Sequence, residues 1–126
     1  MYFQALQGKK KAWGPDHTST LDTVNNLGLL YTSLGRLNEA ENMYFRALQG
    51  YKETLGQEAV KTYIPALNTA QNMAVLFQQT GRMQEAEGLY EQALFGIKAV
   101  FGRTSNKYRS VAKILDKLRS NSEHNL

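Results

Sequence analysis

The hydrophobic residues of this chain recur at intervals of three and four through two long segments. This spacing places their side chains on one face of an α-helix, while the intervening polar residues face water. The stripe of the first segment consists of Leu21, Val24, Leu27, Gly28 and Tyr31, and the stripe of the second consists of Leu67, Ala70, Met73, Ala74 and Phe77. We therefore expect one amphipathic helix in each segment.

A second helix is predicted after each of these, beyond a Gly-Arg pair at Gly35 and at Gly81. Glycine permits the left-handed backbone at which helices end. The stripes of the second helices are Ala40, Tyr44, Ala47 and Leu48 in one unit, and Ala86, Tyr90, Ala93 and Leu94 in the other. Small residues of the first helix are expected to leave a hollow for the tyrosine of the second.

The chain also repeats itself. Residues 1–14 and 43–56 are identical at nine of fourteen positions, and residues 89–102 form a third copy. Mid-helix glycines recur in these copies at Gly8, Gly50 and Gly96, which indicates a close contact between helices. The predicted parts are a truncated repeat's second helix (1–14), a complete repeat (15–56), a complete repeat with a four-residue loop insertion (57–102), a closing helix (103–119) and a polar tail (120–126).

Two stretches resemble a known repeat family. Val24-x-x-Leu27-Gly28-x-x-Tyr31 followed by Ala40-x-x-x-Tyr44 and Ala47 is similar to the tetratricopeptide signature, with valine where tryptophan is commonest. The stretches GPDH (14–17), NNLGLLY (25–31) and GRLNEAENMYFRAL (35–48) resemble kinesin-light-chain-type repeats, most closely the C-terminal arrays of fungal NOD-like (NB-ARC or NACHT) signalling proteins. The resemblance implies an all-α fold, a right-handed superhelical stack of antiparallel helix pairs.

The closing helix is interpreted as a further first helix, with a stripe of Tyr108, Val111, Ile114, Leu115 and Leu118. At the other end, Tyr2, Ala5 and Leu6 form an apolar stripe without the helix that should precede it. We therefore interpret the chain as the C-terminal part of a longer protein and expect self-association through this N-terminal helix.

Composition excludes several functions. The formal charge is +4, the lysines and arginines are scattered apart from residues 9–11, and there is no cysteine. The two histidines, His17 and His124, are too far apart for a metal site, and neither a P-loop nor a hydrolase motif is found. The acidic pairs Glu39/Glu41 and Glu85/Glu87 sit in first turns of helices, where negative charge is favoured. We expect no catalytic residues, no metal and no cofactor, and no membrane association.

The candidate binding residues lie beside the buried stripes of the first helices, which line the concave side of such stacks. They are Asp22, Asn25, Asn26 and Leu29, then Asn68, Gln71, Asn72 and Val75, and finally Arg109 and Lys113 with Asp116 in the closing helix. Amide side chains both donate and accept hydrogen bonds, so they suit the backbone of an extended peptide. The resemblance supports Asn26 and Asn72 in particular; the alternative is that the asparagines only solvate this face or join neighbouring helices.

The sequence therefore predicts a cytoplasmic, non-catalytic scaffold for a protein or peptide ligand, with the basic residues favouring an acidic one. A kinesin-light-chain-type cargo adaptor is the alternative parent. A helical-repeat nucleic-acid binder is a weaker alternative, because such codes use units of about 35 residues.

Overall fold

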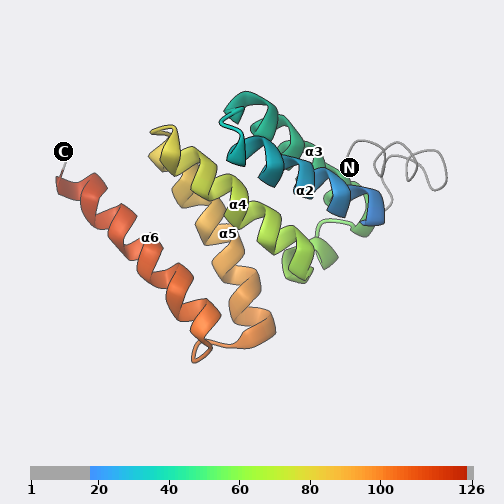
Figure 1. Ribbon diagram of the computed structural model, residues 1–126. Helices are drawn as coiled ribbons and strands as arrows, with labels where there is room; N and C mark the ends of the chain where they lie inside the picture. The colour runs from blue at the N-terminus through green and yellow to red at the C-terminus, as the bar shows by residue number, and fades with distance from the viewer. Residues whose placement is uncertain (1–17, 125–126) are drawn as a thin grey trace. The chain divides into compact units, whose positions relative to one another are not determined.

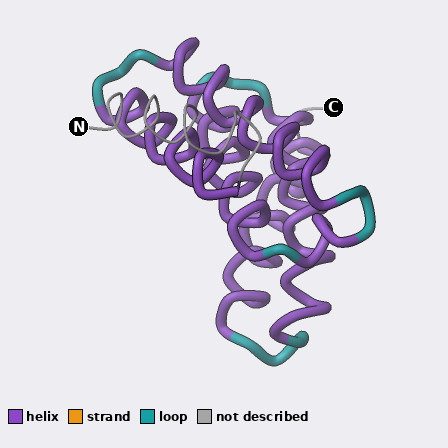
Figure 2. The backbone as a smooth tube through the Cα atoms, turned by 90° about the vertical axis from the view of Figure 1, so that its right-hand side faces the viewer, coloured by secondary structure: helices purple, strands orange, loops and turns teal. Residues whose placement is uncertain are grey.

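The computed structural model describes residues 18–124, and within them every regular element is helical. Residues 18–124 contain five α-helices joined by turns, and their path is drawn in Figure 1 and, with loops between the helices, in Figure 2. The elements are α2 (Thr18–Ser33), α3 (Leu37–Leu55), the 3₁₀ turn η1 (Ala59–Thr62), α4 (Ile64–Gln79), α5 (Met83–Phe101) and α6 (Asn106–His124). The predicted all-α architecture is confirmed.

The helices form two compact units, which divide between Val60 and Lys61. In the first unit α2 packs against α3; in the second α4 packs against α5, and α5 against α6. The predicted helix of residues 1–14, with its stripe of Tyr2, Ala5 and Leu6, lies outside the described residues.

A tyrosine of the second helix fills the hollow above a small residue of the first, as the sequence predicts. Tyr44 is buried against Gly28, and its hydroxyl shares a hydrogen bond of 3.2 Å with the hydroxyl of Thr32. In the second unit Ala74 and Tyr90 are buried at the equivalent positions, and the Tyr90 hydroxyl donates to Oε1 of Gln78 at 2.5 Å. Burial raises the pKa of both tyrosines, since it disfavours the phenolate.

The mid-helix glycines mark close contacts, which confirms their interpretation at the two described positions. A β-carbon on Gly50 would collide with the side chain of Leu21, and one on Gly96 would collide with Leu67 and the backbone carbonyl of Lys61. Lys61 belongs to η1, so part of the four-residue insertion packs directly on α5.

Each helix pair turns at a glycine with positive φ, 77° at Gly35 and 80° at Gly81. The next residue, an arginine, closes the turn: its backbone N–H donates to the carbonyl of Tyr31 in one unit and of Phe77 in the other, a Schellman arrangement. The glycines are required there because other residues rarely adopt this backbone.

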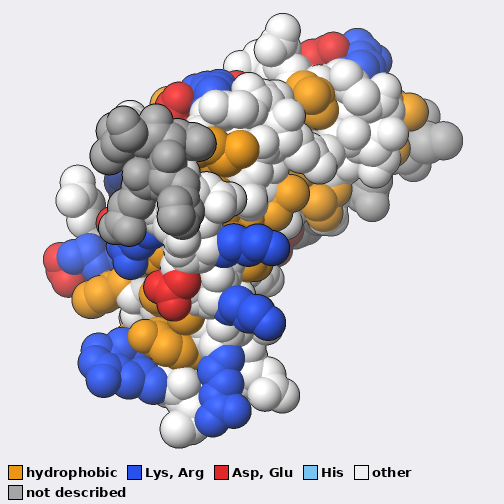
Figure 3. All heavy atoms as spheres, turned by 90° about the vertical axis from the view of Figure 1, so that its left-hand side faces the viewer, with side chains coloured by type: hydrophobic (Ala, Val, Ile, Leu, Met, Phe, Trp, Pro, Cys, Tyr) orange, Lys and Arg blue, Asp and Glu red, His pale blue; other side chains and the backbone are white. Residues whose placement is uncertain are grey.

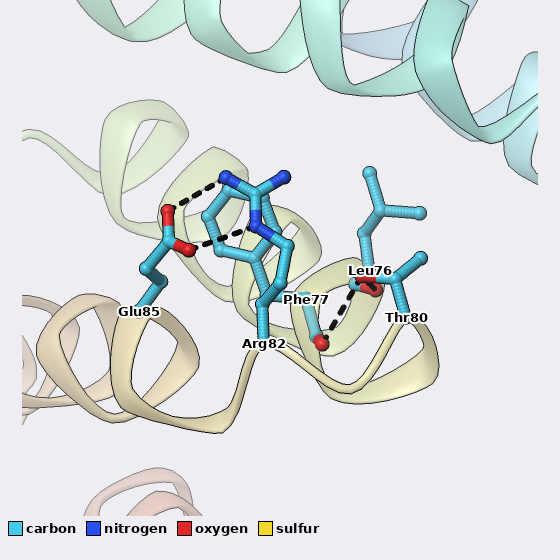
Figure 4. A network of polar contacts seen from close by, with 5 residues as sticks. All are labelled: Leu76, Phe77, Thr80, Arg82 and Glu85. Carbon is cyan, nitrogen blue, oxygen red and sulfur yellow. Dashed lines mark hydrogen bonds and ion pairs between the residues drawn. The ribbon is translucent and has the colours of Figure 1, made fainter.

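The same arginine joins the two helices through its side chain. The guanidinium carbon of Arg82 lies 4.0 Å from the centre of the Phe77 ring, and two of its nitrogens bond the Glu85 carboxylate at 2.8 and 2.6 Å (Figure 4). Arg36 repeats the arrangement with Tyr31, at 5.1 Å, and with Glu39. These contacts were missed by the sequence analysis, although Arg and Glu recur three residues apart in both units.

The closing helix departs from the prediction in two ways. It continues to His124, five residues beyond the predicted end, so most of the predicted polar tail is helical. Its buried residues are Val111, Leu115 and Leu118, whereas Ile114, predicted to share their stripe, is 37% exposed.

Candidate interaction surface

The polar residues predicted to bind a peptide lie on one side of α2 in the first unit. Asn25 and Asn26 are half-buried, and Leu29, one turn further along, is 43% exposed. Asp22 is exposed at the same side, and it accepts a hydrogen bond from the buried Tyr51 hydroxyl of α3. The Tyr51 hydroxyl therefore holds the Asp22 carboxylate in place.

The equivalent side of α4 carries the same pattern in the second unit. Asn68 is exposed, Gln71 and Asn72 are half-buried, and Val75 is 43% exposed. Gln71 donates to the carbonyl of Leu67 in its own helix at 3.4 Å. Both first helices thus present an apolar residue beside side chains that donate and accept hydrogen bonds.

A contact in the second unit joins α4 to the closing helix. Nζ of Lys107 donates to Oδ1 of Asn68 at 3.4 Å, and it also lies 5.4 Å from the ring centre of Phe101. A lysine ammonium thereby stands at the start of the polar side of α4. Figure 3 shows Lys and Arg side chains beside hydrophobic ones at the lower end of one face, where Figure 1 places the turn between α5 and α6.

The spacing from the preceding glycine aligns α6 with α2, the first helix of the first unit. Thr23 and Val111 each follow a glycine, Gly14 or Gly102, by nine residues, and both are buried. In this register Leu115 matches the buried Leu27. The stripe in the sequence analysis instead pairs Val111 with Val24, which places Ile114 among the buried residues.

This register also explains which positions of α6 are charged. Leu21 and Gly28 of α2 face α3, through Gly50 and Tyr44 respectively. Their counterparts in α6 are Arg109 and Asp116, and both are exposed. The face of α6 that corresponds to the α3-facing side of α2 is therefore charged.

The same register assigns the remaining exposed residues of α6. Arg109 falls at the position of Leu21, which faces the second helix. Lys113 falls at the position of Asn25, Ile114 at that of Asn26, and Lys117 at that of Leu29. All three are exposed, so α6 carries two lysines around an isoleucine at the positions that hold Asn25, Asn26 and Leu29 in α2.

Three of the four carboxylates in the acidic pairs Glu39/Glu41 and Glu85/Glu87 form ion pairs. Glu39 and Glu85 bind the turn arginines. Glu87, together with Glu91, binds Arg119 of α6, at 3.0 and 2.6 Å. The contacts of Glu39, Glu85 and Glu87 are those of a structural role.

Neither a metal cluster nor a membrane span is evident between residues 18 and 124. This part of the chain contains no group of three or more His, Asp or Glu side chains placed to hold a metal ion. None of its helices combines the length and hydrophobicity needed to cross a bilayer.

Comparison with known proteins agrees with this architecture. The family model described as "Tetratricopeptide repeat" matches residues 20–58 and 66–106, together more than half of the chain. Among solved structures, BtubC (BKLC) from P. vanneervenii superposes with a TM-score of 0.81 at 24% sequence identity, over 96% of this chain and 46% of that one. The chain thus spans about half the length of that structure, and the likeness shows the fold. No curated protein sequence matches significantly.

Membership in such a family supports a protein-interaction scaffold, since stacked helical repeats offer extended binding surfaces. Three observations lead to one assignment. They are the repeated Gly-Arg turns, the tyrosines packed on small residues and the match of both complete repeats. The chain belongs to the tetratricopeptide repeat family.

Proposed function

We propose that this protein is a non-catalytic scaffold whose first helices bind an extended peptide from a protein partner. The observation that carries the proposal is the repetition of one surface on α2 and α4: half-buried amides at Asn26 and Asn72, each beside an exposed aliphatic residue. Amides can pair with the N–H and C=O groups of any peptide backbone, and the aliphatic residue can contact a side chain.

The closing helix favours an acidic ligand. Lys113 and Lys117 are exposed on the side of α6 that continues the amide positions, and Lys107 stands beside Asn68. Their ammonium groups attract carboxylates, and salt should weaken this attraction because the lysines are solvated. At this helix Lys113 is retained from the residues predicted by sequence, and Lys117 is favoured over Arg109.

We further propose that the parent protein is a fungal NOD-like signalling protein, in which these repeats form the C-terminal sensor and act in the cytoplasm. The stretches GPDH and NNLGLLY support this origin. A kinesin-light-chain-type cargo adaptor is the alternative. An upstream P-loop would indicate the first parent and an upstream heptad coiled coil the second.

The binding proposal is tested with a peptide selected from a displayed library on the intact chain. Asn26→Ala and Asn72→Ala should each weaken binding by roughly two- to tenfold, the equivalent of one hydrogen bond of about 0.5–1.5 kcal/mol. Asn42→Ala is the matched control, because Asn42 is an exposed asparagine on α3. Calorimetry measures affinity, and thermal melts verify folding. If Asn42→Ala weakens binding while the other two variants bind normally, the peptide lies on another face.

Nucleic-acid binding is the competing outcome. RNA binding through phosphates would show an affinity that falls steeply with salt and that is insensitive to loss of the two amides.

A further inference from the structure

The side of α5 that faces away from its buried residues carries an exposed stripe that the proposed function does not use. Phe95, at its centre, is 61% exposed. The stripe, which we call the outer α5 stripe, consists of Gln84, Gly88, Gln92, Phe95 and Ala99, all exposed and spaced by three and four residues. Helical periodicity places them opposite the buried Ala86, Tyr90, Ala93 and Ile97.

The equivalent stripe of α3 is entirely polar, although the two helices are copies of one another. Its residues are Asn38, Asn42, Arg46, Gln49 and Glu53. The fold of a helix pair therefore does not require glycine, phenylalanine or alanine at these positions. Packing within the helix pair does not explain why α5 exposes these residue types where α3 exposes polar ones.

No contact within the described residues explains why position 88 is a glycine. A β-carbon added there would meet no atom within 4 Å, in contrast to Gly50 and Gly96. Glycine in the middle of a helix lowers the stability of that helix relative to alanine. An exposed glycine thus leaves a shallow hollow on the surface of α5, two turns before the exposed ring of Phe95.

We propose that the outer α5 stripe is a self-association surface, on which the α5 helices of two copies pack antiparallel. Phe95 of each copy then enters the hollow at Gly88 of the other. The two positions are seven residues, or about 10 Å, apart along the helix, and Gln92 lies near their midpoint. A twofold axis close to Gln92 relates the two contacts: it places Phe95 of the first copy at Gly88 of the second, and Phe95 of the second at Gly88 of the first. A symmetric dimer requires such a self-complementary surface.

The charges along α5 favour the same pairing. Carboxylates stand in its N-terminal half, at Glu85, Glu87 and Glu91, and cations follow in its C-terminal half and the next turn, at Lys98 and Arg103. Arg82 neutralises Glu85, while Arg119 is shared by the other two carboxylates and leaves a net negative charge. Antiparallel packing places this negative end of each helix beside the positive end of the other.

The first test is the mass of the intact chain in sedimentation experiments over rising micromolar concentration. The native chain should approach the mass of a dimer. The variant Gly88→Asn with Phe95→Gln, which installs the residues found in α3, should stay monomeric and keep its helical circular dichroism. A native chain that remains monomeric throughout this range would overturn the proposal.

Two control variants separate this surface from other apolar residues. Phe45→Glu removes a 55% exposed phenylalanine of α3 and installs the residue found in α5, at Glu91. Tyr2→Ser with Leu6→Ser removes the N-terminal stripe. Both should still dimerise. Dimers that are lost in either control but persist in the Gly88→Asn, Phe95→Gln variant would contradict a site on α5.

Cross-linking locates the twofold axis. The chain has no cysteine, so Gln92→Cys introduces a single thiol. A short bifunctional maleimide should join two copies through residue 92 but not through Gln49→Cys. Gln49 is an exposed glutamine of α3 at the position equivalent to Phe95. Equal yields from the two variants would mean random collision and would refute the arrangement. Peptide binding at the first helices is independent of all three measurements.

Discussion

The ring of Tyr44 occupies the space in which a side chain at Gly28 would stand: a β-carbon built on that glycine lies 2.5 Å from Cε1 of the tyrosine. Gly28→Ala should therefore destabilise the protein by about 1–3 kcal/mol, because the buried ring must shift within a packed core. Chemical denaturation of the variant and the parent measures the loss.

Gly88→Ala is the control for this substitution. The added methyl group at Gly88 meets no neighbour within 4 Å, so the gain in helix propensity should raise stability by up to about 1 kcal/mol. The comparison is made at low protein concentration, where self-association is negligible. Equal losses at both glycines would show that helix geometry, rather than the Tyr44 ring, sets the cost.

The two buried tyrosines should be the most sensitive side chains of their helix pairs. Tyr44→Ala and Tyr90→Ala each remove a buried ring and should destabilise by roughly 3–5 kcal/mol. Tyr44→Phe keeps the ring and loses only the hydrogen bond to Thr32, so its cost should be about 0.5–1.5 kcal/mol. Thermal melts measure all three. A loss below about 1 kcal/mol for both alanine variants would contradict a packing role.

The contact between Arg82 and Glu85 should make a small contribution to stability that depends on pH. The hydrogen bond from Arg82 lowers the pKa of Glu85 below its ordinary value of 4.5. A carboxylate with a lowered pKa in the folded state stabilises that state above the unfolded pKa and loses its effect as pH falls through the folded pKa. Glu85→Gln should thus lower the melting temperature at pH 7, and the difference should vanish well below pH 4.5.

Glu53→Gln provides the comparison, because Glu53 is an exposed carboxylate of α3 outside this contact. Its melting temperature should follow the parent at every pH. A difference between Glu85→Gln and the parent that persists unchanged in acid would assign the effect to side-chain packing instead of the ion pair.

The helix pairs were predictable from the sequence because their determinants are local and occur twice. A glycine before an arginine ends a first helix at both Gly35 and Gly81, and the small residues facing Tyr44 and Tyr90 stand at fixed intervals. The glycine-arginine pairs directly predict turns, and the spacing of the small residues predicts packing positions. The residues that form the cation–π contacts, Arg36 and Arg82 with their aromatic partners, also recur in the sequence. The contacts themselves were not predictable, because their geometry depends on how closely the two helices approach.

The closing helix was harder to predict because no second helix covers it within residues 18–124. Where α3 covers Leu21, nothing within residues 18–124 covers the equivalent Arg109, so only part of the usual stripe remains hydrophobic. With fewer apolar residues, both Val111 and Ala112 could be aligned with Val24. The spacing from Gly102 favours Ala112, and we therefore propose Lys117 in place of Arg109.

The last prediction tests this shift by charge reversal on α6. In the register set by the spacing from Gly102, Lys117 stands at the position of Leu29 and Val75, whereas Arg109 stands at that of Leu21. Both side chains are exposed, and both variants change the net charge equally. For an acidic peptide selected on the intact chain, Lys117→Glu should weaken binding several-fold more than Arg109→Glu, since only Lys117 is proposed to contact the ligand.

Salt separates this local contact from the overall charge of the protein. Interactions between solvated charges are largely screened beyond about 8–10 Å at physiological ionic strength. The small effect of Arg109→Glu should therefore disappear at such salt, while part of the effect of Lys117→Glu should remain because its partner is adjacent. Calorimetric titrations at low and physiological salt give both quantities. Arg109→Glu could instead weaken binding more than Lys117→Glu at both salt concentrations. The ligand would then lie along the side of α6 that carries Arg109 and Asp116, and Arg109 rather than Lys117 would belong to the binding surface.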